Sequence, residues 1–294
     1  MISFSIRFHE LMLGSDQSAF ISRYGSSKEI AVAEQEIRFD DGAAYEQMMG
    51  IWSRAAGDVF LDWLAPRSGL SWIDVGCGNG AFTELIVARC APAEVHGIDP
   101  SEGQLAFART RLAADVAQFH RGDAMALPFP NDSFDAAVMA LVIFFVPDPT
   151  KGVAEMTRTV RPGGLVSAYA WDIPGGGLPN SPIQAEMRAM GIKPLLPPNA
   201  HAARIDALRN LWTGAGLEAV QTHEITVQRT FDSFDDFWTR SLLGGGIGPV
   251  IAAMPSGDVE MLKARVRSRL PADVAGRVTA NAHANAIKGQ MPMR

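Results

Sequence analysis

The chain has 294 residues and a mass of 31.6 kDa, and 47% of its residues are hydrophobic while 20% are charged. This composition is typical of a folded protein with a large core and excludes disordered and fibrous classes. The 26 basic and 32 acidic residues give a net charge of −6, and no run of Lys or Arg is long enough to follow a phosphate backbone, so we expect no nucleic-acid partner.

The N-terminal residues 1–40 show no sustained periodicity and are expected to be an extension. Residues 41–66 have helical spacing and predict two helices that end at Pro66. From residue 71 onward, strands and helices are expected to alternate. The expected strands are 71–75, 95–99, 117–120, 134–145, 165–171, 219–230 and 278–288, and the expected helices are 83–90, 102–117, 151–159, 183–190, 204–215, 234–243 and 258–270.

This alternation predicts an α/β fold, a Rossmann-like and mostly parallel sheet with helices on both faces. Length alone allows one or two domains. Because the last strand is needed to complete the sheet, we predict one domain over residues 41–294. The Gly- and Pro-rich stretch 172–203 interrupts the alternation and is expected to be a small cap insertion beside the substrate.

The two cysteines, Cys77 and Cys90, are too few for a disulfide framework and indicate a reducing compartment. His9 and Glu10 stand where the apolar stretch of a signal peptide would continue. The longest apolar run, residues 136–146, is too short to span a membrane but suits a strand buried on both faces. We therefore expect a cytoplasmic protein without a membrane span; the sequence predicts no oligomeric state.

A glycine-rich segment, Asp74-Val-Gly-Cys-Gly-Asn-Gly-Ala81, lies between an expected strand and an expected helix. Glycines there let the backbone turn sharply and approach a ligand, and the helix that follows presents unpaired N–H groups. Asp99 follows Gly80 by 19 residues at the end of the next strand, where its carboxylate could accept hydrogen bonds from both hydroxyls of a ribose. Together these features indicate an adenosine-containing ligand.

Several motifs resemble those of the class I S-adenosylmethionine-dependent methyltransferases, and most of all their small-molecule branch in ubiquinone and menaquinone biosynthesis. The motifs are the Asp74 to Gly80 loop, Gly97-Ile-Asp-Pro-Ser101, Arg121-Gly-Asp-Ala124 before Leu127-Pro-Phe129, Phe134-Asp135, and Arg161-Pro-Gly-Gly164. The resemblance covers residues 45–294. It implies methyl transfer from S-adenosylmethionine to a small molecule, and a seven-stranded sheet in the order 3-2-1-4-5-7-6 with the last strand antiparallel.

The resemblance also implies roles for individual residues. Gly76, Cys77 and Gly78 would hold the methionine portion, Asp99 the ribose, and Asp123 with Ala124 the adenine. Tyr45, Trp52 and Arg54 would lie in the helices that cover the cofactor, with Arg54 pairing with the methionyl carboxylate. The complete set of expected cofactor-binding residues is Tyr45, Trp52, Arg54, Asp74, Gly76, Cys77, Gly78, Asp99, Pro100, Ser101, Gln104, Asp123, Ala124 and Leu141.

Some of these residues also have simpler interpretations. Asp123 could accept a hydrogen bond within an Asx turn, Trp52 could serve helix packing, and Cys77 is expected to fill space in the loop rather than to act as a nucleophile.

The carboxyl end of the expected strand 134–145 should face the transferred methyl group. It carries Phe144 and Phe145, and the next strand ends at Trp171 and Asp172, so these four residues are the expected substrate pocket for an apolar or aromatic acceptor. The two phenylalanines could instead be core residues. No catalytic residue is identified, and no pair of the six histidines has the spacing of metal ligands, so no metal is expected.

Two other functions remain open at this point. A protein that binds S-adenosylmethionine without catalysis, as a regulator or partner subunit, is consistent with phenylalanines at the position where relatives often carry a histidine. An NAD(P)-dependent oxidoreductase is consistent with Gly76-x-Gly78-x-x-Ala81 and Asp99, although Asp123 and Ala124 would then have no role.

Overall fold

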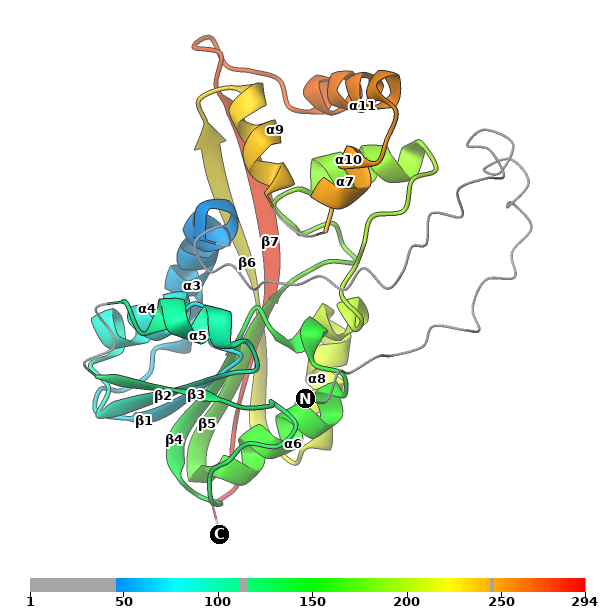
Figure 1. The fold of residues 1–294 in the computed structure, drawn as a ribbon. Helices are drawn as coiled ribbons and strands as arrows, with labels where there is room; N and C mark the ends of the chain where they lie inside the picture. The colour runs from blue at the N-terminus through cyan, green and yellow to red at the C-terminus, as the bar shows by residue number, and fades with distance from the viewer. Residues whose placement is uncertain (1–45, 112–115, 244–245, 294) are drawn as a thin grey trace. The chain divides into compact units, whose positions relative to one another are not determined.

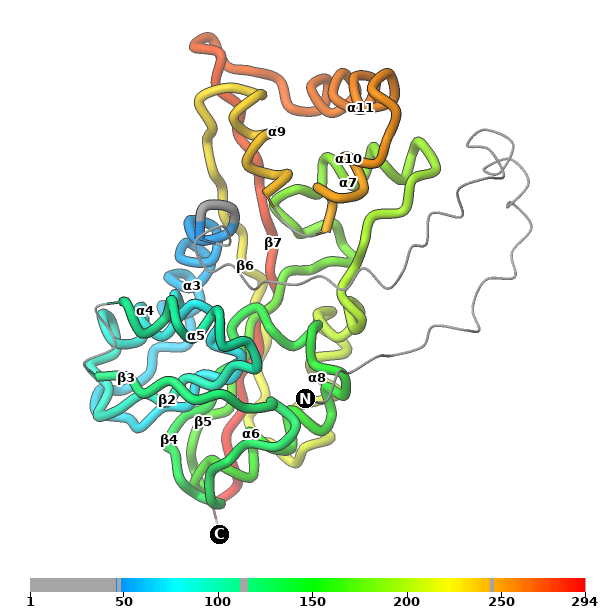
Figure 2. Tube along the Cα trace, in the orientation of Figure 1, coloured from blue at the N-terminus to red at the C-terminus, as the bar shows by residue number. Residues whose placement is uncertain are grey.

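Seven strands form one sheet in the order β3-β2-β1-β4-β5-β7-β6 in the computed structural model, which describes residues 46–111, 116–243 and 246–293 (Figure 1). The strands are β1 (Ser71–Val75), β2 (Glu94–Asp99), β3 (Ala117–Arg121), β4 (Phe134–Ala140), β5 (Val160–Trp171), β6 (Glu218–Phe231) and β7 (Val278–Gln290). Strands β1 to β5 pair in parallel, and β7 runs antiparallel to β5 and β6, between which Figure 2 shows it inserted. The predicted sheet, strand order and antiparallel last strand are confirmed.

Helices cover both faces of this sheet, which explains why its central strands are largely apolar and buried. All five residues of β1 are buried, as are Ala136 to Met139 in β4. Figure 1 shows α4 and α5 on one side of the sheet and α6 and α8 on the other. The helices around the sheet are α3 (Ile51–Leu64), α4 (Ala81–Cys90), α5 (Glu102–Ala108), α6 (Pro149–Thr159) and α8 (Ile205–Gly214), with the short turns η1 (Glu46–Gly50), η3 (Ile143–Phe145) and η4 (Ala200–Ala203).

Aromatic side chains on β5 and α8 mark the two layers of the core. On one face, Tyr169 of β5 packs against Phe60 of α3 and Phe82 of α4, with ring centroids 4.7 and 5.4 Å apart. The other face is covered by α8, where the indole of buried Trp212 donates a hydrogen bond to the Val166 carbonyl at 3.0 Å. One sheet therefore holds both layers together.

Several predicted boundaries were wrong. The helix expected over 102–117 ends at Ala108, because the next N–H groups, of Thr110 and Arg111, bond three residues back and tighten the turn. The strand expected over 134–145 ends at Ala140, since Leu141 adopts a positive φ of 62°. The two helices expected over 41–66 are one stretch, η1 running directly into α3; residues 41–45 lie outside the described part of the chain.

Strands β6 and β7 continue past the edge of the sheet. Ala284 of β7 pairs with Trp171 at the end of β5, and beyond it Val278 to His283 pair only with β6. The helices α9 (Phe234–Leu242), α10 (Gly248–Ala252) and α11 (Ser256–Arg269) connect the far ends of this two-stranded ribbon, and Figure 1 shows them beside its upper part. We call this two-stranded part, residues 226–231 of β6 and residues 278–283 of β7, the ribbon.

The ribbon carries a helical layer that also includes α7 (Ser181–Ala189), and we call α7, α9, α10 and α11 the cap helices. Buried Glu186 of α7 accepts hydrogen bonds from Arg265 and Arg269 of α11, which joins the two parts. The insertion expected at 172–203 contains only α7 and η4, so the helices between β6 and β7 contribute as much to this layer.

Membrane-spanning helices were sought among residues 46–111, 116–243 and 246–293, and none there is long and apolar enough to cross a bilayer.

Candidate functional site

The loop between β1 and α4 is built around glycines. Its φ angles are 77° at Gly76, 52° at Gly78 and 78° at Gly80, a region that residues with a Cβ rarely adopt. The N–H groups of Gly76 and Cys77 donate to the Ile98 carbonyl of β2 at 2.7 and 2.9 Å. A Cβ on Gly76 would lie 2.4 Å from a methyl carbon of Val142. The loop thus keeps its backbone open and fixed at the carboxyl end of the sheet.

The Asp99 carboxylate lies against this loop. Its two oxygens accept hydrogen bonds from the N–H of Gly78 at 2.9 Å and from the N–H of Ser101 at 2.8 Å. Burial raises the pKa of Asp99, and the two backbone N–H groups lower it. A carboxylate has about four acceptor positions, so two remain for the hydroxyls of a ribose. The structure therefore brings Asp99 and Gly78 together at the carboxyl end of the sheet.

A second carboxyl group lies beneath the loop. Asp74 is fully buried, and one of its oxygens accepts a hydrogen bond from the Thr83 hydroxyl at 2.6 Å. The other oxygen is buried with no hydrogen-bond partner within the described segments. The pKa of Asp74 is raised to about 7, mainly by burial and to a smaller extent by the Asp99 charge, while the Thr83 hydrogen bond acts in the opposite direction. A bound cation would stabilise the ionised form of both carboxyls.

Cys77 lies in the same loop and is buried. Burial raises the pKa of its thiol well above the ordinary value, and the charges of Asp74 and Asp99 act in the same direction. The thiol is therefore protonated at neutral pH, as expected for a residue that fills space in the loop.

The ends of β3 and β4 complete the surroundings of the loop. The Gly122 N–H donates to the Asp99 carbonyl at 3.1 Å, which places exposed Asp123 and half-buried Ala124 next to β2. One oxygen of Asp123 accepts a hydrogen bond from the Met125 N–H at 2.8 Å, the Asx-type turn considered above, and this leaves its second oxygen for a ligand.

The remaining residues expected at this edge also lie here. Leu141, with its positive φ, follows β4 and is held by a bond from its N–H to the Tyr169 carbonyl. Ser101 caps α5 by accepting from the N–H of buried Gln104, and Pro100 stands between Asp99 and Ser101.

A clamp around the loop was missed by sequence reasoning. Arg111 donates to the Asn79 carbonyl at 2.6 Å and pairs with Glu46 and Glu84 at 2.5 and 2.9 Å. Asn79 in turn donates to Glu46 at 3.0 Å. Because Arg111 and Glu46 lie about 30 residues from the loop on either side and belong to no motif, no sequence signal could have indicated them.

Of the three N-terminal residues expected to cover the cofactor, the structure describes two, Trp52 and Arg54. Tyr45 lies outside the described residues. Buried Trp52 packs against Phe231 of β6 at a centroid distance of 6.3 Å, which fits the helix-packing interpretation. The exposed Arg54 side chain pairs with Glu84 at 3.0 Å, so its predicted pairing with a ligand carboxylate would require this ion pair to open.

The expected substrate residues lie at the ends of β4 and β5. Phe144 and Trp171 are buried, half-buried Phe145 contacts Phe144 edge-on with ring centroids 4.7 Å apart, and Asp172 accepts a hydrogen bond from the Gly175 N–H. The Phe144 carbonyl accepts from the Asn199 N–H at 3.0 Å. This end of the sheet is therefore apolar and is tied to the segment that precedes η4.

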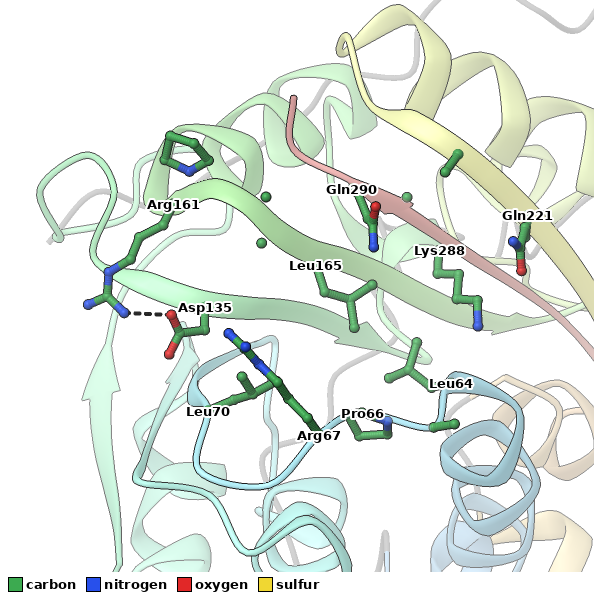
Figure 3. Close-up of a pocket in the computed structure, with 16 residues that line it drawn as sticks. Leu64, Pro66, Arg67, Leu70, Asp135, Arg161, Leu165, Gln221, Lys288 and Gln290 are labelled. Atoms are coloured by element: carbon green, nitrogen blue, oxygen red, sulfur yellow. Dashed lines mark hydrogen bonds and ion pairs between the residues drawn. The ribbon is translucent and has the colours of Figure 1, made fainter. Parts of the chain in front are cut away.

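A cavity of about 590 Å³ opens at the opposite edge of the sheet, and none of the expected cofactor or substrate residues lines it (Figure 3). Three of its charged groups, Asp135, Arg161 and Lys288, have structural partners. Figure 3 shows Arg161 turned toward Asp135, with which it forms an ion pair at 2.8 Å. Lys288 donates to the Trp63 carbonyl at the end of α3 at 3.1 Å. We therefore assign the functional site to the glycine loop and not to this cavity.

Residues 73–168 match the family model described as "Methyltransferase domain". This span begins in β1 and ends in β5, so it contains the glycine loop, Asp99 and Asp123. By this match, the part of the sheet that surrounds the glycine loop is similar to methyltransferase domains. Within this part, β1, β2 and β4 supply the residues that surround the loop.

Curated relatives match part of this chain. The demethylmenaquinone methyltransferase of Desulfitobacterium hafniense is 36% identical over 105 residues, 34% of this chain and 42% of that protein. The ubiquinone/menaquinone biosynthesis C-methyltransferase UbiE of Dinoroseobacter shibae is 34% identical over 136 residues, 45% of this chain and 54% of that protein. The chain spans about half the length of these relatives.

Solved structures share the fold over a longer stretch. The YcgJ protein of Bacillus subtilis has a TM-score of 0.55 at 16% identity and covers 81% of this chain and 99% of its own. Phosphoethanolamine N-methyltransferase 2 of Haemonchus contortus, solved with S-adenosyl-L-methionine, has a TM-score of 0.53 at 18% identity and covers 85% of this chain and 56% of its own. At these identities the likeness concerns the fold alone.

Proposed function

We propose that this chain binds S-adenosylmethionine at the glycine loop and transfers its methyl group to a small apolar or aromatic molecule. The observation that carries the proposal is the pair of buried carboxyl groups, Asp74 and Asp99, around an open glycine backbone. S-adenosylmethionine supplies a methyl group on a positively charged sulfur, together with an ammonium group. Two buried acids favour such a cationic ligand and disfavour the negatively charged pyrophosphate of NAD(P) at the same loop.

The residues present fit this ligand. The Asp99 carboxylate, held by the N–H groups of Gly78 and Ser101, keeps two acceptor positions for a ribose diol, and Asp123 keeps one oxygen for an exocyclic amine. Gly76 lacks the Cβ that would collide with Val142, so the loop keeps its open backbone. The other residues of the predicted set, including Trp52 and Arg54, remain part of the proposal.

The chain's own contribution to methyl transfer would be orientation. An in-line displacement requires the acceptor atom, the methyl group and the sulfur to be aligned, and positioning alone can contribute about 7 to 11 kcal/mol in well-organised cases. Phe144, Phe145 and Trp171 would position the acceptor ring, with Asp172 as the nearest polar group. The named relatives act on demethylmenaquinone or in ubiquinone and menaquinone biosynthesis, so we propose a quinol-type ring as the first acceptor class to test.

The proposal extends to the organisation and setting of the chain. We propose residues 41–294 as the methyltransferase domain, residues 1–40 as an extension, and residues 172–203 together with α9 to α11 as the cover of the acceptor. The two cysteines, both free and buried, support a cytoplasmic location.

Two measurements test the function. Calorimetric titration with S-adenosylmethionine, S-adenosylhomocysteine and NAD should give binding of the first two, and binding of NAD alone would overturn the assignment. A labelled-methyl assay against quinols, phenols and amines should then give a product. Cofactor binding without transfer to any acceptor would favour a non-catalytic regulator or partner subunit.

Asp99→Asn provides the matched variant for both measurements, because it removes the charge that would face the ribose. Glu102→Gln is its control: Glu102 is an exposed carboxylate three residues away that pairs with Arg109. Equal cofactor affinity of the two variants would contradict the role of Asp99.

A further inference from the structure

Arg229 is a charged residue on an otherwise apolar face of the ribbon. Alternate residues of a strand share a face, and the packing of Trp52 on Phe231 shows which face is turned toward α3. Apart from Arg229, the residues on this face are all apolar and buried: Ile225, Val227 and Phe231 on β6, and Val278, Ala280, Ala282 and Ala284 on β7. A guanidinium among them requires an explanation.

Within residues 46–111, 116–243 and 246–293, no carboxylate forms an ion pair with the Arg229 guanidinium. It lies over the Phe231 ring, 4.6 Å from the centroid, and its Nη1 atom is buried without a hydrogen-bond partner in the described parts of the chain. Among the charged groups that act on it are Arg240 and Asp236 of α9, but Asp236 already accepts a hydrogen bond from Arg240 at 2.6 Å. Burial lowers the pKa of Arg229, and the Arg240 charge lowers it further while Asp236 raises it.

The Arg229 side chain is half-buried, but its Nη1 atom is buried, and a buried donor without a partner is unfavourable for folding because its transfer out of water is compensated only by a hydrogen bond or a counter-ion. The neighbouring residues at the same depth of the ribbon are small or aromatic: Ala280 is the register partner of Arg229, and Phe231 follows two positions later. In the part of the chain that the structure describes, the side chain therefore has one buried donor and no group that accepts from it.

The position of Arg229 connects it to the glycine loop. Its partner Ala280 lies four residues beyond Ala284, so Arg229 lies about 13 Å past the carboxyl end of β5 at roughly 3.3 Å per residue. The Phe231 ring beside it packs on Trp52 of α3. Immediately before α3, η1 carries Glu46, which accepts the hydrogen bond from Asn79 of the glycine loop.

We propose that Arg229 pairs with a carboxylate of a ligand bound at this edge of the sheet, and so determines which ligands the site accepts. The proposal rests on the proposed methyltransferase function. A guanidinium fork matches a carboxylate through two parallel hydrogen bonds, which would satisfy the buried Nη1 donor. The carboxylate has two possible sources, the methionyl group of the cofactor or an acidic group on the acceptor. Arg54, the residue that the sequence indicated for the methionyl group, is already paired with Glu84.

The first arm of the test separates these sources by calorimetry of Arg229→Met with two nucleosides. S-adenosylhomocysteine carries the methionyl-type carboxylate, and 5′-methylthioadenosine lacks it. If the cofactor is the source, the variant should bind S-adenosylhomocysteine at least tenfold more weakly than the wild type and methylthioadenosine equally well. Failure of the wild type to bind either nucleoside would refute the proposed function itself.

The second arm uses an acid and its ester in the presence of S-adenosylhomocysteine, 4-hydroxybenzoate against methyl 4-hydroxybenzoate. If the acceptor is the source, the wild type should bind the acid at least tenfold more tightly than the ester, and Arg229→Met should lose this preference while its nucleoside binding is unchanged. Unchanged nucleoside binding together with an unchanged ratio of acid to ester binding would overturn the proposal.

Stability separates this role from a purely structural one. Without ligand, Arg229→Met should keep or raise the Tm, because it removes a buried donor without a partner from a half-buried side chain. Arg277→Met is the control, since it removes the same charge from an exposed arginine paired with Asp273 next to the ribbon. A Tm well below that of the control would mean that Arg229 supports the fold, and this would overturn the proposal. If Arg229→Met fails to fold, Arg229→Lys takes its place, because it keeps the charge but lacks the two parallel donors of the guanidinium. It should show the same selective loss of ligand binding. Binding equal to that of the wild type would refute the proposal.

Discussion

Asp74 should make the stability of the protein fall as the pH rises from about 4 to 7. Its ordinary pKa is 3.8 in the unfolded chain and burial raises it to about 7 in the folded one. Between these values the folded chain binds one proton more than the unfolded chain, so the free energy of unfolding falls by about 1.4 kcal/mol per pH unit. Over about three pH units the loss is about 4 kcal/mol, complete once the pH exceeds the folded pKa.

The measurement compares the wild type with Asp74→Asn, because other groups titrate in the same range. Burial also raises the pKa of Asp99, while it lowers that of His120, whose contribution therefore has the opposite sign. Asparagine is neutral at every pH and still accepts the hydrogen bond from the Thr83 hydroxyl. Urea unfolding followed by tryptophan fluorescence at half-unit steps from pH 4 to 8.5 gives the difference between the two proteins at each pH.

This difference should change by about 4 kcal/mol in favour of Asp74→Asn and then level off above pH 7. A difference that stays constant across the range would refute the reasoning, because it would mean that Asp74 ionises as easily in the folded chain as in the unfolded one. A change confined to pH below 5 would place the folded pKa near its ordinary value and would lead to the same conclusion.

Three further outcomes follow from contacts in the same structure. Gly76→Ala should destabilise the fold by about 2 to 5 kcal/mol, because the new Cβ would collide with Val142 at a positive φ. Gly78→Ala should cost only about 1 to 2 kcal/mol, because its Cβ would have no atom closer than 3.8 Å. Equal Tm values of the two variants would contradict this difference. Asp99→Asn should weaken S-adenosylmethionine binding in calorimetry by about ten- to a hundredfold, because one or more hydrogen bonds to a charged group are lost. Unchanged affinity would mean that Asp99 does not contact the cofactor. Glu186→Gln should lower the free energy of unfolding by about 1 to 2 kcal/mol, because it weakens the ion pairs with α11. Limited proteolysis should then cut residues 246–255 faster than in the wild type. Equal cleavage rates would mean that this contact does not hold the cap helices in place.

The sequence was informative where local chemistry decides the structure. The period of the apolar residues predicted the strands, and glycines that must adopt positive φ predicted the loop. Asp99 was predicted at the loop because a short βαβ unit places the ends of β1 and β2 side by side. Leu141 was different: its positive φ ended β4 five residues early, and leucine gives no sequence signal for that conformation.

Contacts between distant segments could not be predicted in this way. The Arg111 clamp joins η1, the glycine loop and α4 through ionic contacts across as many as 65 residues of sequence, and a single arginine in a polar stretch has no pattern. The same holds for Arg229, which the sequence shows only as one polar residue in a strand with alternating apolar positions.

The polar groups at the two ends of the sheet differ in whether they have partners. At the amino edge, Arg161 and Lys288 are bonded to neighbouring groups and hold turns and helix ends in place. At the carboxyl edge, Asp74 and Arg229 each leave a buried polar atom without a partner in the described chain. Leaving such atoms without a partner is unfavourable for folding, so we expect a bound ligand to satisfy them. A ligand with a cationic centre and a carboxylate would satisfy both, and this is the charge pattern of the methionyl part of S-adenosylmethionine.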